Sequence, residues 1–157
     1  MSTFNGLPAH ILLNHFVVVL GPLTAILAIL CAVWPAARRR LIWLVLLLAV
    51  ATLVLTPVTA NAGGWLAARI GTSSPALTTH EQLGGTLIYM VAALVATVTL
   101  LAAIHIRQVR GRTVKFALQS VVGLLVIVAA VATLVQTYRI GDSGARAAWG
   151  NLTSSAQ

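Results

Sequence analysis

The chain contains very few charged residues, and acidic residues are the rarest of all. Charged side chains make up 8% of its 157 residues, whereas a soluble domain of this size usually carries about a quarter. Only Glu81 and Asp142 are acidic, against ten Lys and Arg, while apolar residues make up 59% of the chain. This composition excludes an ordinary soluble domain and predicts an integral membrane protein.

Cysteine and recognisable cofactor motifs are also scarce. Cys31 is the only cysteine, so no internal disulfide forms, and its position deep in an apolar run predicts a packing role. The sequence contains no HExxH, CxxC or CxxCH segment, and therefore no motif fixes the geometry of a metal or haem site. No Ser/His/Asp set occurs in a catalytic motif, so an enzyme is poorly supported. Ser143, between Gly141 and Gly144, is expected to serve a turn.

The N-terminal segment lacks the features of a cleavable secretory signal. Residues 1–9 contain no Lys or Arg, and the apolar run that follows is too long for the apolar core of a signal peptide. The three consecutive arginines at 38–40 come after that run, which is the reverse of the signal-peptide order. We therefore expect the first helix to remain in the mature protein.

Four long apolar runs predict four membrane-spanning helices in a single domain, residues 1–157. A spanning helix needs about 20 apolar residues, and four stretches satisfy this: 10–34, 41–60, 83–105 and 116–138. Backbone groups inside lipid must be paired internally, which favours helices, and the lack of period-2 alternation argues against a small barrel. We predict an all-α, up-down bundle with an outer loop at 61–82 and an outer tail at 139–157. Short interfacial helices are expected at 64–70 and 144–150.

The basic residues predict the orientation of these helices. Turns at 35–40 and 106–115 hold seven Lys and Arg, and the opposite side of the bundle holds Arg69, Arg139 and Arg146. Because cytoplasmic loops are enriched in Lys and Arg, we expect both termini outside. Dispersed charges of this kind do not form a nucleic-acid-binding surface; the expected partner is the lipid bilayer.

Most residues capable of metal or proton chemistry fall at the outer ends of the runs. They are His10, His15, His80, Glu81 and Asp142. Imidazole is a common ligand of zinc, copper and haem iron, and four-helix bundles build cofactor sites from facing helices. His15 lies about 140° around the helix from His10 and about 7 Å deeper. We predict His15 and His80 as first ligands of a metal or haem, with His10, Glu81 and Asp142 as further candidates.

Simpler roles are open for the same residues. His10 fits an interfacial residue that contacts headgroups, and His15 fits a hydrogen bond directed into the bundle, because unpaired polar groups in a membrane are costly. Glu81 with Arg139, or Asp142 with Arg146, would form plain ion pairs. Thr78 or Thr79 could cap the third helix. His105 is expected to be an interfacial residue at the inner side.

Several ordered segments resemble a known family. They are Gly6-Leu7-Pro8-Ala9-His10, Asn14-His15-Phe16, Thr79-His80-Glu81-Gln82-Leu83-Gly84 and Arg139-Ile140-Gly141-Asp142-Ser143-Gly144-Ala145. The chain is similar to the bacterial, especially actinobacterial, four-helix membrane family known as domain of unknown function 2231. The resemblance implies a histidine pair at His10 and His15, a histidine at His80, and a location in the bacterial cytoplasmic membrane. Family members often carry a histidine where this chain has Asp142, which puts a four-histidine site in doubt.

The leading hypothesis is therefore a small membrane protein whose outer polar cluster binds haem or a transition metal, with a redox or metal-related role. The alternative is an accessory subunit of a larger membrane complex, or a homo-oligomer, without its own cofactor. Small residues that would permit close helix approach support the alternative; they are Ala92, Ala96, Gly123, Ala129 and Ala130. A transporter is less well supported, because no charge lies at mid-membrane.

Overall fold

Four long helices make up most of the protein. The computed structural model describes residues 3–4, 7–71 and 75–154, with side chains placed for 13–69, 71 and 75–147. A short antiparallel pair of strands, β1 (Thr3–Phe4) and β2 (Leu7–Pro8), precedes the helices. The helices are α1 (Ala9–Val33), α2 (Pro35–Ile70), α3 (Pro75–Val109) and α4 (Phe116–Ser154). The predicted all-α, four-helix fold is confirmed.

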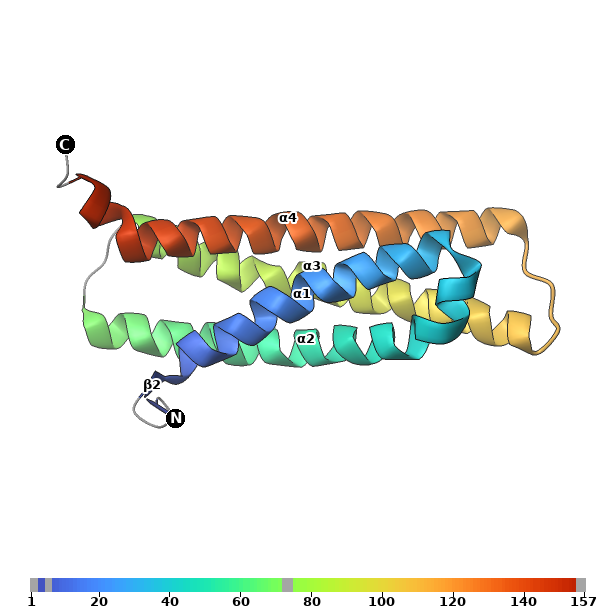
Figure 1. The fold of residues 1–157 in the computed structure, drawn as a ribbon, viewed down its shortest axis with the longest axis horizontal. Helices are drawn as coiled ribbons and strands as arrows, with labels where there is room; N and C mark the ends of the chain where they lie inside the picture. The colour runs from blue at the N-terminus through green and yellow to red at the C-terminus, as the bar shows by residue number, and fades with distance from the viewer. Residues whose placement is uncertain (1–2, 5–6, 72–74, 155–157) are drawn as a thin grey trace.

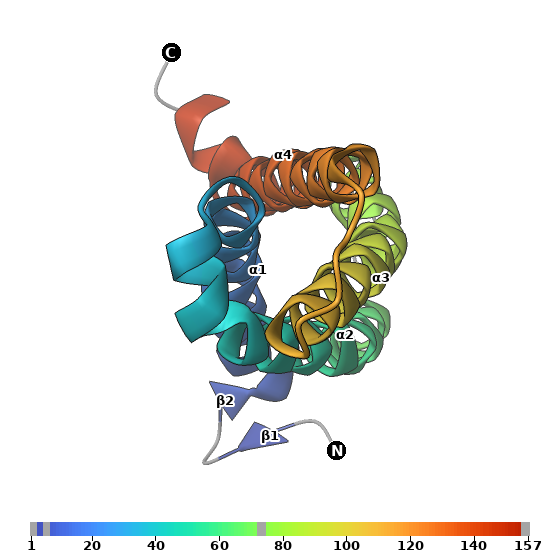
Figure 2. The ribbon, with the colours of Figure 1, turned by 90° about the vertical axis from the view of Figure 1, so that its right-hand side faces the viewer.

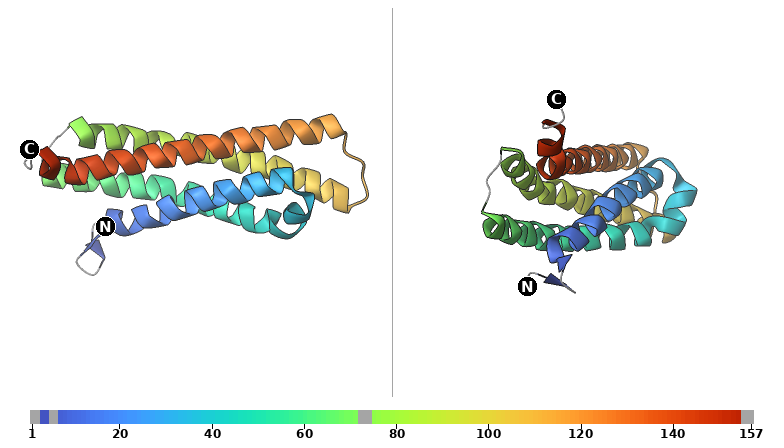
Figure 3. Two further views of the ribbon diagram at one scale, coloured as in Figure 1. Left: turned by 45° about the horizontal axis from the view of Figure 1, so that its top comes forward. Right: turned by 60° about the vertical axis from the view of Figure 1, so that its left-hand side comes forward.

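The helices form an up-down bundle in which each packs against its neighbours in sequence and α4 closes against α1 (Figures 1 and 2). Helix α1 runs obliquely, from beside α2 at one end toward α4 at the other (Figure 3). The beginning of α1 and the end of α4 lie at the same end of the bundle, with Gly71. We call this the terminal end. The opposite end, with Trp34 and residues 110–115, is the turn end.

The outer surface of the bundle is apolar along its length. All four helices contain windows apolar and long enough to cross a membrane. Large apolar side chains are exposed on every helix, among them Val19, Leu47, Tyr89 and Leu124. Apolar surface of this extent is not tolerated in water, whereas lipid tails solvate it. Contact with a lipid bilayer follows from this surface.

Several predicted boundaries were wrong, because the helices extend through glycine-containing segments. Most of the predicted loop at 61–82 is helical, since α2 continues to Ile70 and α3 begins at Pro75. Gly71 ends α2 with φ of 69° and donates its N–H to the Ala67 carbonyl, the left-handed cap that glycine favours. The predicted tail at 139–157 continues α4 to Ser154. The segments 64–70 and 144–150 are parts of α2 and α4 rather than separate interfacial helices.

The predicted basic turn at 35–40 is also helical. Helix α2 begins at Pro35, directly after Trp34, whose backbone is extended. Proline suits this first helical position because its missing N–H would have no partner there. The three arginines at 38–40 therefore belong to the first two turns of α2 and have fixed positions around the helix.

The buried interior changes character along the bundle. Toward the turn end it is apolar and tightly packed, with Cys31, Ile42, Val98 and Leu101 each 0% exposed; the packing role expected for Cys31 is confirmed. Toward the terminal end the apolar cluster is small, consisting of Val17, Leu87, Val91 and Ile140. Polar side chains are buried around it, among them Thr56, Thr59, Gln136, Thr137 and Ser143. Buried hydroxyl and amide side chains thus gather toward the terminal end, whereas the buried Arg38 and His105 lie at the turn end.

Candidate functional site

His80 is held against α4 near the start of α3. Its Nδ1 lies 3.1 Å from the Ile140 carbonyl oxygen and 3.1 Å from Ser143 Oγ. Ser143 Oγ in turn donates to the Ile140 carbonyl at 3.0 Å. Residues 140 and 143 share a helix face because they are three apart. The imidazole therefore contacts a backbone acceptor and a hydroxyl from the same turn of α4.

These contacts bear on the tautomer of His80. A carbonyl oxygen only accepts hydrogen bonds, so a hydrogen bond to Ile140 goes with a proton on Nδ1, whereas the Ser143 hydroxyl at the same distance can accept from or donate to that nitrogen. In the neutral ring a proton on Nδ1 leaves the lone pair on Nε2. Metal-ligating histidines typically show this arrangement, with one ring N–H donated to a carbonyl or carboxylate and the other nitrogen directed at the metal.

Gly144 makes room for the imidazole. A Cβ atom at this position would lie 3.0 Å from Cε1 and 3.2 Å from Nδ1 of His80, closer than ordinary van der Waals contact. Any larger residue at this position therefore requires the ring or the helix to shift by a few tenths of an ångström. The helical segment from Ile140 to Gly144 thus supplies both the acceptors and the space for His80.

A cavity of about 430 Å³ lies next to His80, between α2 and α3. On the α2 side it is lined by Ala60, Gly63, Gly64 and Ala67, which follow the i, i+3, i+4, i+7 spacing of one helix face. Their small side chains keep α2 from filling the space in front of α3. A run of small residues on one face thus creates the cavity.

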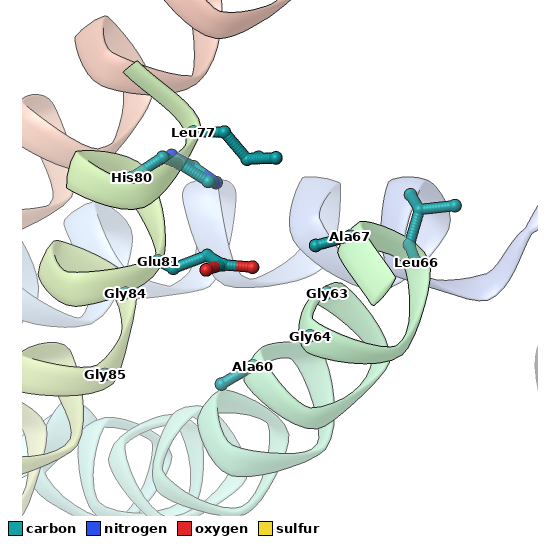
Figure 4. Close-up of a pocket in the computed structure, with 10 residues that line it drawn as sticks. All are labelled: Ala60, Gly63, Gly64, Leu66, Ala67, Leu77, His80, Glu81, Gly84 and Gly85. Atoms are coloured by element: carbon teal, nitrogen blue, oxygen red, sulfur yellow. The ribbon is translucent and has the colours of Figure 1, made fainter. Parts of the chain in front are cut away.

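The α3 side of this cavity carries its polar groups. His80 and Glu81 extend from α3 toward α2 (Figure 4), and Gly84 and Gly85 lie one turn further on. Leu66 and Leu77 complete the lining. The cavity is mostly apolar, with one imidazole and one carboxylate side by side. Its volume falls in the range of small-molecule and cofactor pockets, about 300–1,000 Å³.

A second, smaller cavity of about 40 Å³ connects His80 to the polar interior. Its polar lining comes from three helices, with Asn14 on α1, Thr56 and Thr59 on α2, and Thr137 on α4. The hydroxyls of Thr56, Thr59 and Thr137 each donate to a carbonyl four residues earlier. Their oxygens still accept hydrogen bonds, and His80 lies between this polar interior and the larger cavity.

The structure brings His80 and Glu81 to one cavity and places Asp142 at a different one. His15 is exposed on α1, whereas its neighbour Asn14 lines the small cavity with His80; the expectation that His15 points into the bundle was wrong, because adjacent helical residues point about 100° apart. The side chain of His10 lies outside the described residues. Among the side chains that are described, no three His, Cys, Asp or Glu residues lie close enough to hold a metal ion together.

Asp142 faces away from the larger cavity and forms the predicted ion pair with Arg146. Its Oδ2 lies 3.0 Å from Arg146 Nε, and both side chains are largely exposed, at 44% and 73%. An exposed i, i+4 pair contributes only about 0.3–0.5 kcal/mol. Asp142 is therefore a surface carboxylate paired within its own helix.

Several residues of the site were not anticipated. Ser143 is helical and contacts His80 rather than serving a turn, and Thr79 donates to the Pro75 carbonyl inside α3 rather than capping it. Gln136 links α4 to α3 through Leu83 O at 2.9 Å and Thr86 Oγ1 at 2.6 Å. The i, i+3, i+4, i+7 pattern of small residues on α2 was the one sequence signal that could have revealed the cavity.

The family comparison agrees with this architecture. Residues 6–155 match the family described as predicted membrane protein (DUF2231). The chain belongs to this family. The DUF2231 match covers all four helices, so the bundle and its terminal-end cavity both lie within the family domain. No curated protein and no solved structure matches the chain.

Proposed function

We propose that this DUF2231 protein binds haem or a transition-metal ion at its terminal end, with His80 as the protein ligand, and serves a redox or metal-related role in the membrane. The observation that carries the proposal is the contact of His80 Nδ1 with the Ile140 carbonyl. That contact orients the ring, and with Nδ1 as the donor in it the lone pair lies on Nε2, as in metal-ligating histidines. The contacts of the ring with Ser143 and Gly144 also support the proposal, because they hold the imidazole in one orientation.

The lining of the cavity supports a mostly apolar ligand. Its walls are glycine, alanine and leucine, so backbone and ligand can approach closely, and Glu81 adds a single carboxylate. A closed transition-metal site takes four donors, whereas haem takes as few as one protein ligand. One oriented imidazole beside an apolar cavity therefore favours haem over a bare metal ion, with His10, His15, Glu81 and Asp142 kept as candidates for additional donors.

The test compares visible absorption spectra of the purified protein and of a matched set of variants. The protein is expressed with a haem precursor, purified in mild detergent, and examined by visible absorption and elemental analysis. A Soret band or stoichiometric metal is expected in the wild type and is lost in His80→Gly. Added imidazole should restore the band in His80→Gly, because the missing ring is replaced in place.

His105→Gln is the matched control, because it removes a histidine from the opposite end of the same helix and should leave the spectrum unchanged. A wild-type protein that is well folded but shows neither a Soret band nor stoichiometric metal contradicts the proposal. A band that persists in His80→Gly without imidazole contradicts the assignment of His80.

We further propose that the protein lies in the bacterial cytoplasmic membrane with both termini outside. Seven of the ten basic residues belong to the turn end, and positively charged segments remain cytoplasmic. Single cysteines at Ala68 and Arg112, in a Cys31→Ala background, test this with a membrane-impermeant maleimide on intact cells. Labelling is expected at position 68 before permeabilisation and at position 112 only afterwards; the reverse result would reverse the orientation.

One observation favours the alternative role as an accessory subunit or homo-oligomer. Ala92 and Ala96 are exposed on α3 and four residues apart, whereas Gly123, Ala129 and Ala130 are buried within the bundle itself. Exposed small residues at this spacing allow close approach of another membrane helix. Cross-linking from Ala96→Cys in native membranes tests it, with Leu124→Cys, an exposed position on α4, as control; a monomeric band in Ala96→Cys, or equal cross-linking in both, would count against it.

A further inference from the structure

The turn end of the bundle carries positive charge without any carboxylate of the chain nearby. The two acidic residues, Glu81 and Asp142, both belong to the terminal end. At 1.5 Å per residue, Glu81 lies about 36 Å along α3 from His105. This exceeds the screening length of about 8 Å at physiological ionic strength. The arginines of the turn end therefore gain no charge compensation from either carboxylate.

One of these arginines is buried. Arg38 is 3% exposed, and its Nη1 has no hydrogen-bond partner among the described residues. Its neighbours Arg39 and Arg40 are exposed. A buried charge is costly unless it is paired and hydrogen-bonded. The position of Arg38 thus calls for an anionic partner from outside the chain.

A cavity of about 440 Å³ adjoins Arg38 and can hold such a partner. Its polar lining comes from Arg38 and Arg39 on α2, His105 and Gln108 on α3, and Gln119 on α4. Gln108 Nε2 donates to Gln119 Oε1 at 2.9 Å, which joins α3 to α4 beside the cavity. His105 is buried at 8% exposed.

The beginning of α2 adds a further positive contribution. Pro35 lines the same cavity at the first position of a 36-residue helix. The first backbone N–H groups of a helix have no partner within it, and the helix dipole is positive at that end. Both favour an anion. The guanidinium and the imidazole thus provide donors around one space, and the helix dipole adds to the positive potential there.

We propose that this cavity binds a phosphate group, with Arg38 as its principal ligand. Phosphate matches the planar donor pair of a guanidinium in a two-point contact, and its charge compensates the buried cation. The group can come from the headgroup of an anionic phospholipid or from free phosphate. This site is independent of the terminal-end cavity, and its occupation does not depend on whether His80 binds a cofactor.

The test measures binding to delipidated protein in a neutral detergent. Native mass spectrometry counts retained dioleoylphosphatidylglycerol against dioleoylphosphatidylcholine, and thermal unfolding is followed with added inorganic phosphate or chloride. Arg38→Gln removes the buried charge with little change in side-chain length. Arg40→Gln is the control, because it removes an exposed charge two residues further along α2. Binding should weaken at least about tenfold in Arg38→Gln, as expected for a lost charge-assisted hydrogen bond, and less than about twofold in Arg40→Gln.

The two sources give different results. Retention of phosphatidylglycerol without stabilisation by phosphate identifies a lipid headgroup, and stabilisation by phosphate that competes with lipid identifies a general phosphate site. The proposal is overturned if Arg38→Gln and Arg40→Gln weaken binding equally. It is also overturned if the protein prefers neither phosphatidylglycerol over phosphatidylcholine nor phosphate over chloride. If Arg38→Gln does not fold, Arg39→Gln, an exposed residue of the same cavity, replaces it and must weaken binding more than Arg40→Gln does.

Discussion

Gly144 of α4 lies directly against the imidazole of His80 on α3, so closely that a methyl group at Gly144 would sit 3.0 Å from Cε1 of the ring. The two residues are far apart in the sequence, and their contact fixes how α3 and α4 are rotated relative to each other at the terminal end. This contact can be tested with a one-carbon change.

Gly144→Ala should displace His80 and lower stability by about 1–3 kcal/mol, the usual cost of overpacking. The matched control is Gly141→Ala, because a Cβ there meets nothing within 4 Å, and alanine in a helix is favoured over glycine by up to about 1 kcal/mol. Thermal unfolding in detergent measures both. Equal stabilisation by both substitutions would show that the ring has room to move.

Ser143→Ala should weaken the orientation of His80 while leaving the fold intact. The lost hydrogen bond is worth about 0.5–1.5 kcal/mol, and loss of a group that orients a ligating histidine typically costs 10–100-fold in metal affinity. Ligand titration compares it with Ser120→Ala, an exposed serine at the other end of α4. Unchanged affinity in Ser143→Ala would mean that Ser143 does not orient a ligand.

Asp142→Asn should change neither ligand binding nor stability by more than about 1 kcal/mol, because its ion pair with Arg146 is exposed. Unfolding at low and high salt measures the small contribution of this ion pair to stability, which should disappear at high salt. Loss of the bound ligand in Asp142→Asn would show instead that this carboxylate is a ligand.

Gln136→Leu should loosen α4 from α3, since Gln136 donates to both Leu83 O and Thr86 Oγ1. Side-chain hydrogen bonds between membrane helices contribute about 0.6 kcal/mol on average and at most about 1.7, and a loss within this range is expected. Gln82→Leu, an exposed glutamine on α3, is the control. Hydrogen exchange should rise around Leu83 and Thr86 in Gln136→Leu alone.

The number and type of the helices could be predicted from the sequence, because runs of about 20 apolar residues have few other stable forms in a membrane. Their ends could not. Gly63, Gly64, Gly141 and Gly144 favour turns locally, yet all four are helical. Gly144 packs against His80, and Gly63 and Gly64 line the larger cavity.

The partners of His80 were also beyond prediction from the sequence. The sequence indicates His80 and His15 as candidate ligands, but it gives no signal for the contacts of His80 with Ile140 and Ser143. Helices that are apolar on all sides give no periodic signal for which face points inward. The rotation that exposes His15 and turns Asn14 toward His80 is set by packing of all four helices, and no spacing within one helix encodes it.

The length of the helices determines how a ligand reaches the larger cavity. Helix α2 is 36 residues long, about 54 Å at 1.5 Å per residue, whereas the hydrocarbon layer is about 30 Å thick. Measured from Arg40, Ala60 and Ala67 lie about 30 and 40 Å along α2. With the arginines at one boundary of the hydrocarbon, the cavity opens into the opposite headgroup layer. On the proposed function, an amphipathic ligand that partitions into that leaflet would reach the protein by lateral diffusion in two dimensions, and its effective concentration would be set by the membrane rather than by the surrounding water.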